Sequence, residues 1–452
     1  MLEPAQATRR RTSQMFAIAL GLCAGCPDGS DVSVGIGDAL NLEDCAGGST
    51  DCKSNGTSTT ATASEPKQCS HEVMGRLEPI FRIDLQKRHC PDASSLNEHC
   101  SVAEGPIAVG EDGSLWAVSS VSRSLRSGVA GGASASLWLS HYGADGVELG
   151  TQAIANLPGL NVQYQADVAA LPNGDAAVVV YASVHGPDAD VELDEHVWVQ
   201  RYHADVTPYG ATTNLSALGV ADIMSTDDGK LLIGGDAPRN KQRGVLALLD
   251  ESGLVWNQMN TPSVGTGKGW GVTGLSVDSY GRTTMLSVRD QNLAKGEQSF
   301  GVIKLDEQGN RVWNVTLSGK AAAGTWGWFA GDAAGNSTAI IQITSHVRGV
   351  LSGVVAGPEQ FLLLSLDPSG AMRFSYTFGD VIAMSVARDS GQRFVTALEG
   401  YLEPRIYEVA PDGSSCRRFA FPENAVVLGG VQAARGDSLY VNAGRFRMVA
   451  AE

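Results

Sequence analysis

The chain has 452 residues, of which 43% are hydrophobic and 18% are charged, and it contains 54 glycines. This Gly-rich composition with few charges favours many short strands joined by turns over a helical fold. The formal net charge is −16, so nucleic acid would be repelled overall and we exclude it as a partner.

The first 26 residues have the features of an export signal. Three arginines at positions 9–11 precede a short apolar run at positions 15–22, and small residues follow. Ala24-Gly25-Cys26 resembles a bacterial lipobox, although Cys23 stands where that motif usually has Leu. The resemblance implies lipidation at Cys26 and anchoring in the bacterial cell envelope, with the outer membrane as the expected site. The alternative is an ordinary secreted protein cut nearby.

Residues 27–75 have the composition of a tether. They are rich in Gly, Ser, Thr and Asp and contain few large apolar side chains. Such a segment cannot offset its ordering entropy by burial, so we expect it to be flexible. No later segment approaches the roughly 18–20 apolar residues that a membrane span requires. The membrane is therefore expected to be a partner only through a lipid anchor.

Six cysteines remain outside the signal, and an even number in an exported chain indicates disulfides. We expect the local pairs Cys45–Cys52 and Cys90–Cys100, which leaves Cys69 for Cys416. Other connectivities stay open, because spacing alone does not decide among them.

The body, residues 76–452, repeats a strand–turn–strand unit around a Gly-containing turn. Residues 107–118 and 168–179 are clear copies, and their turn glycines are Gly113 and Gly174. Further turns of this kind contain Gly229, Gly281, Gly335, Gly391 and Gly436. The glycines follow one another at intervals of 45 to 61 residues.

A second turn, acidic and followed by an aromatic residue, lies between successive copies of the first. It occurs at residues 249–256, 305–313 and 366–374, with weaker copies at Asp145, Asp205 and Asp412. Asp accepts hydrogen bonds from its own turn and Gly supplies positive φ, so both residues have a structural reason to be there. Each unit therefore holds two hairpins, or four strands, as a propeller blade does.

The ends of the chain complement each other. The C-terminal unit stops after a third strand at residues 446–452, and a matching fourth strand lies at residues 79–85. The sequence thus predicts an all-β fold: a seven-bladed β-propeller with four antiparallel strands per blade, its ring closed by the N-terminal strand joining the C-terminal blade.

The repeated turns resemble those of bacterial secreted and lipoprotein β-propeller repeat proteins. More loosely, Leu-Asp-x-x-Gly followed by Trp, as at residues 305–313, resembles the quinoprotein-type propeller repeat and the outer-membrane assembly lipoprotein built from it. The resemblance implies a fold, and propellers of this kind serve as enzymes, scaffolds and binders.

Both turn types lie on one face of the predicted ring, and the longer connections on the other face carry the candidate ligand-binding residues. Arg and Lys suit anionic groups, and Trp suits the flat faces of a glycan. The candidates are Arg123, Arg126, Arg239, Lys241, Arg243, Trp270, Trp326, Trp328 and Arg348, with Arg289 and Lys295 in the same loops. The alternative is that the cations are ordinary solvated residues and that the Trp side chains pack between blades.

An acidic insert with Asp188, Asp190, Glu192 and Asp194 could hold calcium, but it lacks the glycine-assisted bend of such sites, which favours a solvated loop. No other cofactor or metal is predicted. The eight histidines are scattered and no catalytic motif has the required spacing. We therefore expect a non-catalytic platform that binds a protein or glycan. The rival is a secreted enzyme, either a polysaccharide lyase or glycosidase or a quinone-dependent dehydrogenase.

Overall fold

The computed structural model describes residues 67–68, 73–76, 78–90, 98–125, 134–158, 162–185, 192–215, 219–236, 244–259, 271–292, 297–320, 327–343, 360–378, 383–388, 394–399, 405–420, 431–433, 439–442 and 446–451. The predicted signal, Cys26 and most of the predicted tether lie outside these residues.

The described strands form antiparallel four-stranded sheets, as the paired turn signatures predicted. The first four sheets along the chain contain β4 (Glu98–Val109), β5 (Leu115–Leu125), β6 (Ser134–Tyr142) and β7 (Glu148–Pro158); β8 (Val162–Ala170), β9 (Ala176–His185), β10 (Glu192–Tyr202) and β11 (Pro208–Asn214); β12 (Gly219–Ser225), β13 (Leu231–Asp236), β14 (Gly244–Asp250) and β15 (Gly253–Met259); and β16 (Gly271–Val277), β17 (Thr283–Asn292), β18 (Glu297–Leu305) and β19 (Arg311–Lys320).

Three more sheets follow in the described residues. They contain β20 (Gly327–Gly331), β21 (Ser337–Ile343), β22 (Gln360–Leu366) and β23 (Met372–Phe378); β24 (Ala383–Arg388), β25 (Phe394–Glu399), β26 (Arg405–Val409) and β27 (Cys416–Ala420); and β28 (Val431–Ala433), β29 (Leu439–Asn442) and β30 (Phe446–Ala451), with β3 (Glu78–Asp84) as the fourth strand.

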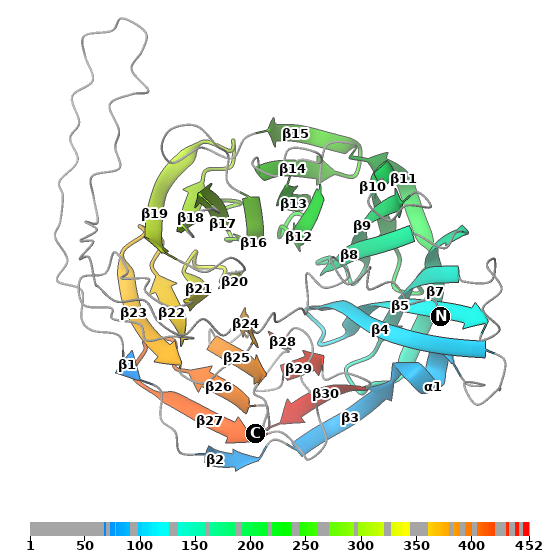
Figure 1. Cartoon of the computed structure of the whole chain (residues 1–452), viewed down its shortest axis with the longest axis horizontal. Coiled ribbons are helices and arrows are strands. Elements are labelled where there is room, and N and C mark those ends of the chain that lie inside the picture. The colour runs from blue at the N-terminus through cyan, green and yellow to red at the C-terminus, as the bar shows by residue number, and fades with distance from the viewer. Residues whose placement is uncertain are drawn as a thin grey trace, which may run out of the picture.

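The sheets have a propeller-like arrangement around a common centre (Figure 1). The first strand of each sheet is innermost and contacts the first strand of the next, in the order β4, β8, β12, β16, β20, β24 and β28, and β28 in turn contacts β4. Apolar side chains fill the space between neighbouring sheets. One such cluster joins Val179 of β9 to Ile233 of β13, and a second joins Leu246 of β14 to Met285 of β17.

The N-terminal segment runs along the outer edges of the last three sheets (Figure 1). β1 (Lys67–Gln68) pairs in parallel with β23, and β2 (Val73–Arg76) pairs in parallel with β27. β3 then pairs antiparallel with β30, which is the predicted contact between the two ends of the body. The two parallel edge strands were not predicted, because residues 67–68 and 73–75 belonged to the expected tether.

The turn glycines have the backbone conformation that the sequence predicted. Gly113, Gly174, Gly229, Gly281 and Gly335 of the first turn type have φ between +74° and +85°. The second type has positive φ at Gly146, Gly253, Gly309, Gly370 and Gly413. In the weak copy at Asp205, Val206 takes this conformation with φ of 69°. The turns with Gly391 and Gly436 lie outside the described residues.

Candidate functional site

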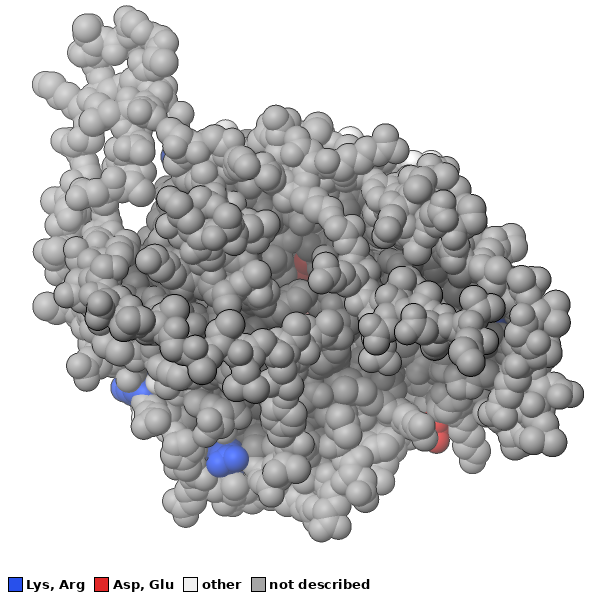
Figure 2. Space-filling view, viewed as in Figure 1, with Lys and Arg blue, Asp and Glu red and all other residues white. Residues whose placement is uncertain are grey.

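The centre of the protein contains a pair of carboxyl groups on neighbouring innermost strands. Asp167 lies on β8 and Asp222 on β12, and their side chains are hydrogen-bonded to each other. Both residues are half-buried. Figure 2 shows acidic atoms in the hollowed centre of the face it presents.

Backbone amides of the following sheets hold both carboxyl groups in place. Oδ2 of Asp167 accepts a hydrogen bond from the amide of Ile223 at 2.9 Å, and Oδ2 of Asp222 accepts one from the amide of Leu275 at 2.7 Å. Oδ1 of Asp167 also accepts the amide of its neighbour Val168 at 2.9 Å. The pair therefore links β8, β12 and β16.

The environment raises the pKa of both groups. Burial disfavours the charged form and is the largest cause, raising the pKa of Asp167 to about 6 although the hydrogen bonds it accepts lower it. Burial also raises the pKa of Asp222 well above its usual range, and the neighbouring Asp167 charge adds to that rise. The pair titrates as a unit, and both groups keep their protons to a higher pH than an exposed Asp does.

The sequence contains a pattern that marks this pair, although the pattern is not a catalytic motif. Asp167 and Asp222 each stand seven positions before a turn glycine, Gly174 and Gly229 respectively. Aligning the repeats on these glycines places both acids at the same point of adjacent innermost strands. The following sheet has Gly274 at that point, so its backbone carries no side chain there.

The observed geometry does not match that of a glycosidase. Retaining glycosidases hold their two carboxyl groups roughly 5–5.5 Å apart, and inverting enzymes hold theirs farther apart to admit water. Here the two groups contact each other directly, and backbone amides occupy further acceptor positions. The arrangement suits proton sharing and contact between sheets.

The face with the tight turns is tied together by polar contacts between sheets. Nη1 of Arg201 donates to the carbonyl of Gly229 in the next sheet at 3.1 Å. The buried Nζ of Lys304 lies 3.1 Å from Oδ2 of Asp278 and donates to the carbonyl of Gly335 at 3.4 Å. These polar groups therefore have a structural role on this face.

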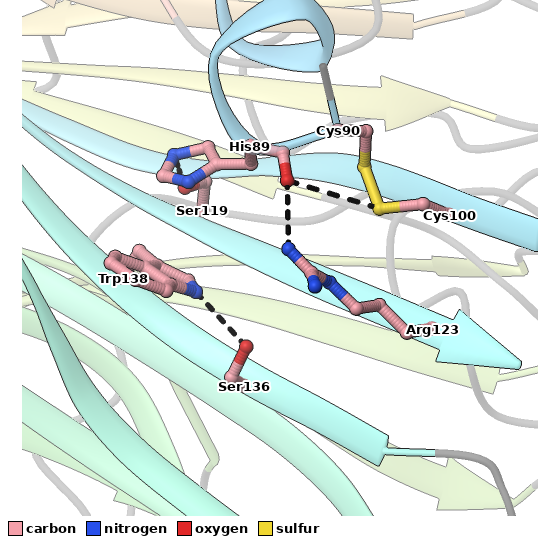
Figure 3. Close-up of a disulfide and its surroundings, with 7 residues drawn as sticks. All are labelled: His89, Cys90, Cys100, Ser119, Arg123, Ser136 and Trp138. Carbon is pink, nitrogen blue, oxygen red and sulfur yellow. Dashed lines mark hydrogen bonds between the residues drawn. A yellow bond between two sulfur atoms is a disulfide. The ribbon is translucent and has the colours of Figure 1, made fainter. Parts of the chain in front are cut away.

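Of the predicted ligand-binding cations, Arg123 has a described side chain (Figure 3). Its Nη2 donates to the carbonyl of His89 at 3.1 Å, beside the predicted and observed disulfide Cys90–Cys100. His89 ends the short helix α1 (Leu85–His89). Arg123 thus supports the start of the body, although its side chain is also exposed.

A Ser–His contact in the same region is buried. Oγ of Ser119 lies 3.4 Å from Nε2 of His89, and His89 packs at 5.1 Å from the ring of Trp138 (Figure 3). Burial lowers the pKa of His89, and the nearby charges of Arg88 and Arg123 lower it further. Because both Ser119 and His89 are buried, this contact is structural packing.

The remaining predicted ligand-binding residues fall largely outside the described residues. Those outside are Arg126, Arg239, Lys241, Arg243, Trp270, Lys295, Trp326 and Arg348. Trp328 lies on the innermost strand β20 and Arg289 lies on β17, but the structure describes only the backbone of these two residues. The set stays a prediction.

The calcium prediction stays a prediction, and the disulfide predictions are tested only in part. Asp188 and Asp190 lie outside the described residues, while Glu192 and Asp194 lie on β10. In the described part of the chain, no three His, Cys, Asp or Glu side chains converge as metal ligands would. Cys416 is disulfide-bonded, while its predicted partner Cys69, like Cys45 and Cys52, lies outside that part.

Comparisons with known proteins find structural likeness alone. No protein-family model matches the chain, and no curated protein matches it in sequence. The polysaccharide lyase Uly1 is 11% identical, with 76% of this chain and 89% of that chain covered and a TM-score of 0.46. The Dos1 propeller is 13% identical, with 83% and 95% covered and a TM-score of 0.42.

Puromycin hydrolase is 14% identical, with 70% of this chain covered and a TM-score of 0.40. The match spans only 53% of the length of that enzyme. At such identities and TM-scores, none of these likenesses carries information on activity. Among the described residues, no helix has both the length and the apolar character needed to cross a membrane.

Proposed function

We propose that the protein is an exported seven-bladed β-propeller, lipid-anchored at Cys26, that acts as a binding platform in the cell envelope. The contact of each innermost strand with the next, including β28 with β4, supports a closed ring. The pairing of β3 with β30 supports closure through the N-terminal strand. The bound partner is a protein or an anionic glycan on the face opposite the tight turns.

The observation that supports this proposal is a difference in length between the connections at the two ends of the strands. In the first five sheets, the turn between the first and second strands always has five residues. At the opposite ends, the connections range from three residues to 16. Antiparallel order places the two sets on opposite faces, and irregular connections on a rigid scaffold are where binding residues concentrate.

The charge of the irregular connections gives the partner its expected chemistry. Arg239, Lys241 and Arg243 follow one another between β13 and β14 in a chain of net charge −16. A cationic cluster on an acidic protein favours an anionic partner by local attraction despite the overall repulsion. Guanidinium groups also bind carboxylate or sulfate in a bidentate manner.

The test is retention on a heparin column, which presents an anionic glycan. The triple variant Arg239→Glu, Lys241→Glu and Arg243→Glu should elute at clearly lower salt than the natural chain. The control, Lys230→Glu, Arg311→Glu and Arg373→Glu, makes the same change of charge at the tight-turn end of the strands. If both triple variants lose retention equally, retention depends on the net charge of the protein and not on the position of these residues. That result would refute the proposed site.

A further inference from the structure

Exposed apolar side chains gather at the tight-turn end of the third and fourth sheets. Tyr280, in the turn between β16 and β17, is 65% exposed, and Val312, near the start of β19, is 56% exposed. Leu254 and Val255, near the start of β15, are exposed as well. A group of large apolar side chains left open to water on a folded protein marks an interaction site.

The tight turns do not require an acid at their second position. An Asp at the first position has a structural role, as Oδ1 of Asp306 accepts the amides of Gln308 and Asn310 at 3.0 and 2.7 Å. The second position is free to vary, and six other turns have Ala144, Pro172, Ala204, Ala333, Pro368 and Pro411 there. Acids occupy it at Glu111 in the first sheet and at Asp227, Glu251 and Glu307 in the third and fourth sheets. The turn geometry therefore does not explain the three acids in these two neighbouring sheets.

The turns of the two sheets lie close enough to form one surface. Lys230 of the third sheet is paired with Asp228, and its pKa is raised by Asp228 first and also by Asp250 and by Glu307 of the fourth sheet. A Cβ added at Gly281 would lie 3.5 Å from Cγ of Glu307, so the turn that contains Tyr280 adjoins Glu307. The acids and the exposed apolar side chains are therefore neighbours.

The surface has an excess of negative charge. Residues 226–230, 250–253, 278–282 and 306–311 contain seven acids and three bases. Two of the bases are held by acids of their own turns, since Lys230 pairs with Asp228 and Nε of Arg282 lies 2.8 Å from Oδ2 of Asp278. The guanidinium group of Arg282 also lies 4.7 Å from the centre of the Tyr280 ring. An anionic partner would be repelled here, and a cationic partner attracted.

We propose that this acidic–apolar patch docks a protein partner that presents Lys or Arg beside apolar side chains. The patch consists of Asp227, Glu251, Val255, Tyr280, Glu307 and Val312. Apolar side chains of the partner cover Tyr280 and Val312, while its cations pair with Glu307 and the other acids at the rim. The patch lies at the tight-turn end, so it is separate from the site proposed on the opposite face, and both can be occupied together.

Fluorescence anisotropy with a short labelled peptide of Lys, Leu and Ser tests the patch directly. The natural chain should bind this peptide about tenfold more tightly than a peptide in which Ser replaces every Leu, or one in which Glu replaces every Lys. The double variant Tyr280→Ser and Val312→Ser should bind it about tenfold more weakly. Glu307→Gln should weaken binding about threefold and reduce its dependence on salt.

The first sheet supplies matched controls. Val147→Ser with Leu149→Ser removes two apolar side chains of similar exposure, and Glu111→Gln removes an exposed acid from the same turn position. Both controls should bind the peptide as the natural chain does. Equal weakening in the controls, or equal binding of the peptide without Leu, would overturn the proposal by showing attraction to net charge alone.

Two further measurements separate this partner from other occupants of the patch. Sedimentation velocity compares the natural chain with the Tyr280→Ser and Val312→Ser variant, and both should sediment alike. A natural chain that self-associates while the variant does not would overturn the proposal in favour of a second copy. Vesicles of phosphatidylcholine and phosphatidylglycerol should not bind through the patch, and binding that the same variant abolishes would overturn the proposal in favour of a lipid surface.

Discussion

The buried ion pair between Lys304 of β18 and Asp278, which follows β16 in the same sheet, offers a sharp test of what stabilises the tight-turn face. Their side chains are only 1% and 2% exposed, and Nζ lies 3.1 Å from Oδ2. Burial alone would raise the pKa of Asp278, but the amide of Arg282 and the Lys304 ammonium group outweigh it and lower the pKa. Replacing Lys304 by Met keeps the aliphatic length and removes the charge.

The expected cost of Lys304→Met is set by what remains around Asp278. Removing one partner of a buried pair costs about 3–5 kcal/mol, because the other charge is left without compensation. Here Nε of Arg282 still lies 2.8 Å from Asp278, so we expect a value near the lower end of that range. The bond from Lys304 to the carbonyl of Gly335 in the next sheet is lost as well.

Urea unfolding near neutral pH measures this cost, and an exposed pair supplies the control. Lys230 and Asp228 form an ion pair in the preceding sheet with side chains 39% and 58% exposed, so Lys230→Met should cost less than about 1 kcal/mol. In a double-mutant cycle, Lys304→Met and Asp278→Asn together should cost at least about 1 kcal/mol less than the sum of the single changes. A cost for Lys304→Met no larger than that for Lys230→Met would refute the reasoning.

Two further changes test other parts of the fold by the same unfolding measurement. Gly413 has φ of +67° and an added Cβ would clash with the Phe374 ring, whereas Gly174 has φ of +85° and open space around it. Gly413→Ala should therefore cost more than Gly174→Ala, which should cost about 1–2 kcal/mol for backbone strain alone; equal costs would contradict the close packing. Cys90→Ser should cost about 2–4 kcal/mol in the free energy of unfolding, because it removes the disulfide to Cys100. A reductant should lower the stability of the natural chain by opening this disulfide, and that contribution should be absent from the variant.

The repeat was predictable because its cause is local. Gly113 and its counterparts need positive φ in a turn whose length hardly varies, so the same residue recurs at the same place in each unit. The parallel edge strands β1 and β2 could not be predicted, because they have two and four residues and their pairing depends on distant strands. No pattern of alternation can appear over so short a length.

The buried polar residues escaped sequence analysis for a different reason. Lys304 stands in the run Val302-Ile303-Lys304-Leu305, where all four residues are buried. A third strand packed by neighbouring sheets on both faces loses the alternation that marks an exposed side chain. Asp167 and Asp222 became recognisable only when the repeats were aligned on their turns, because the pair spans two units.

The two faces of the protein are under different physical constraints, and this difference bears on where a partner can bind. In five of the sheets, the penultimate residue of the third strand is both polar and buried. These residues are His141, Arg201, Lys304, Ser365 and Glu408. Nδ1 of His141 lies 2.7 Å from the carbonyl of Ala204, while Arg201 and Lys304 donate to turn carbonyls of the following sheet. A change at His141, Arg201 or Lys304 removes a hydrogen bond to the following sheet, so the tight-turn face tolerates little variation there. The opposite connections vary several-fold in length while the sheets keep the same order. That face can therefore change its charge and shape for a partner without loss of the contacts that hold the sheets together.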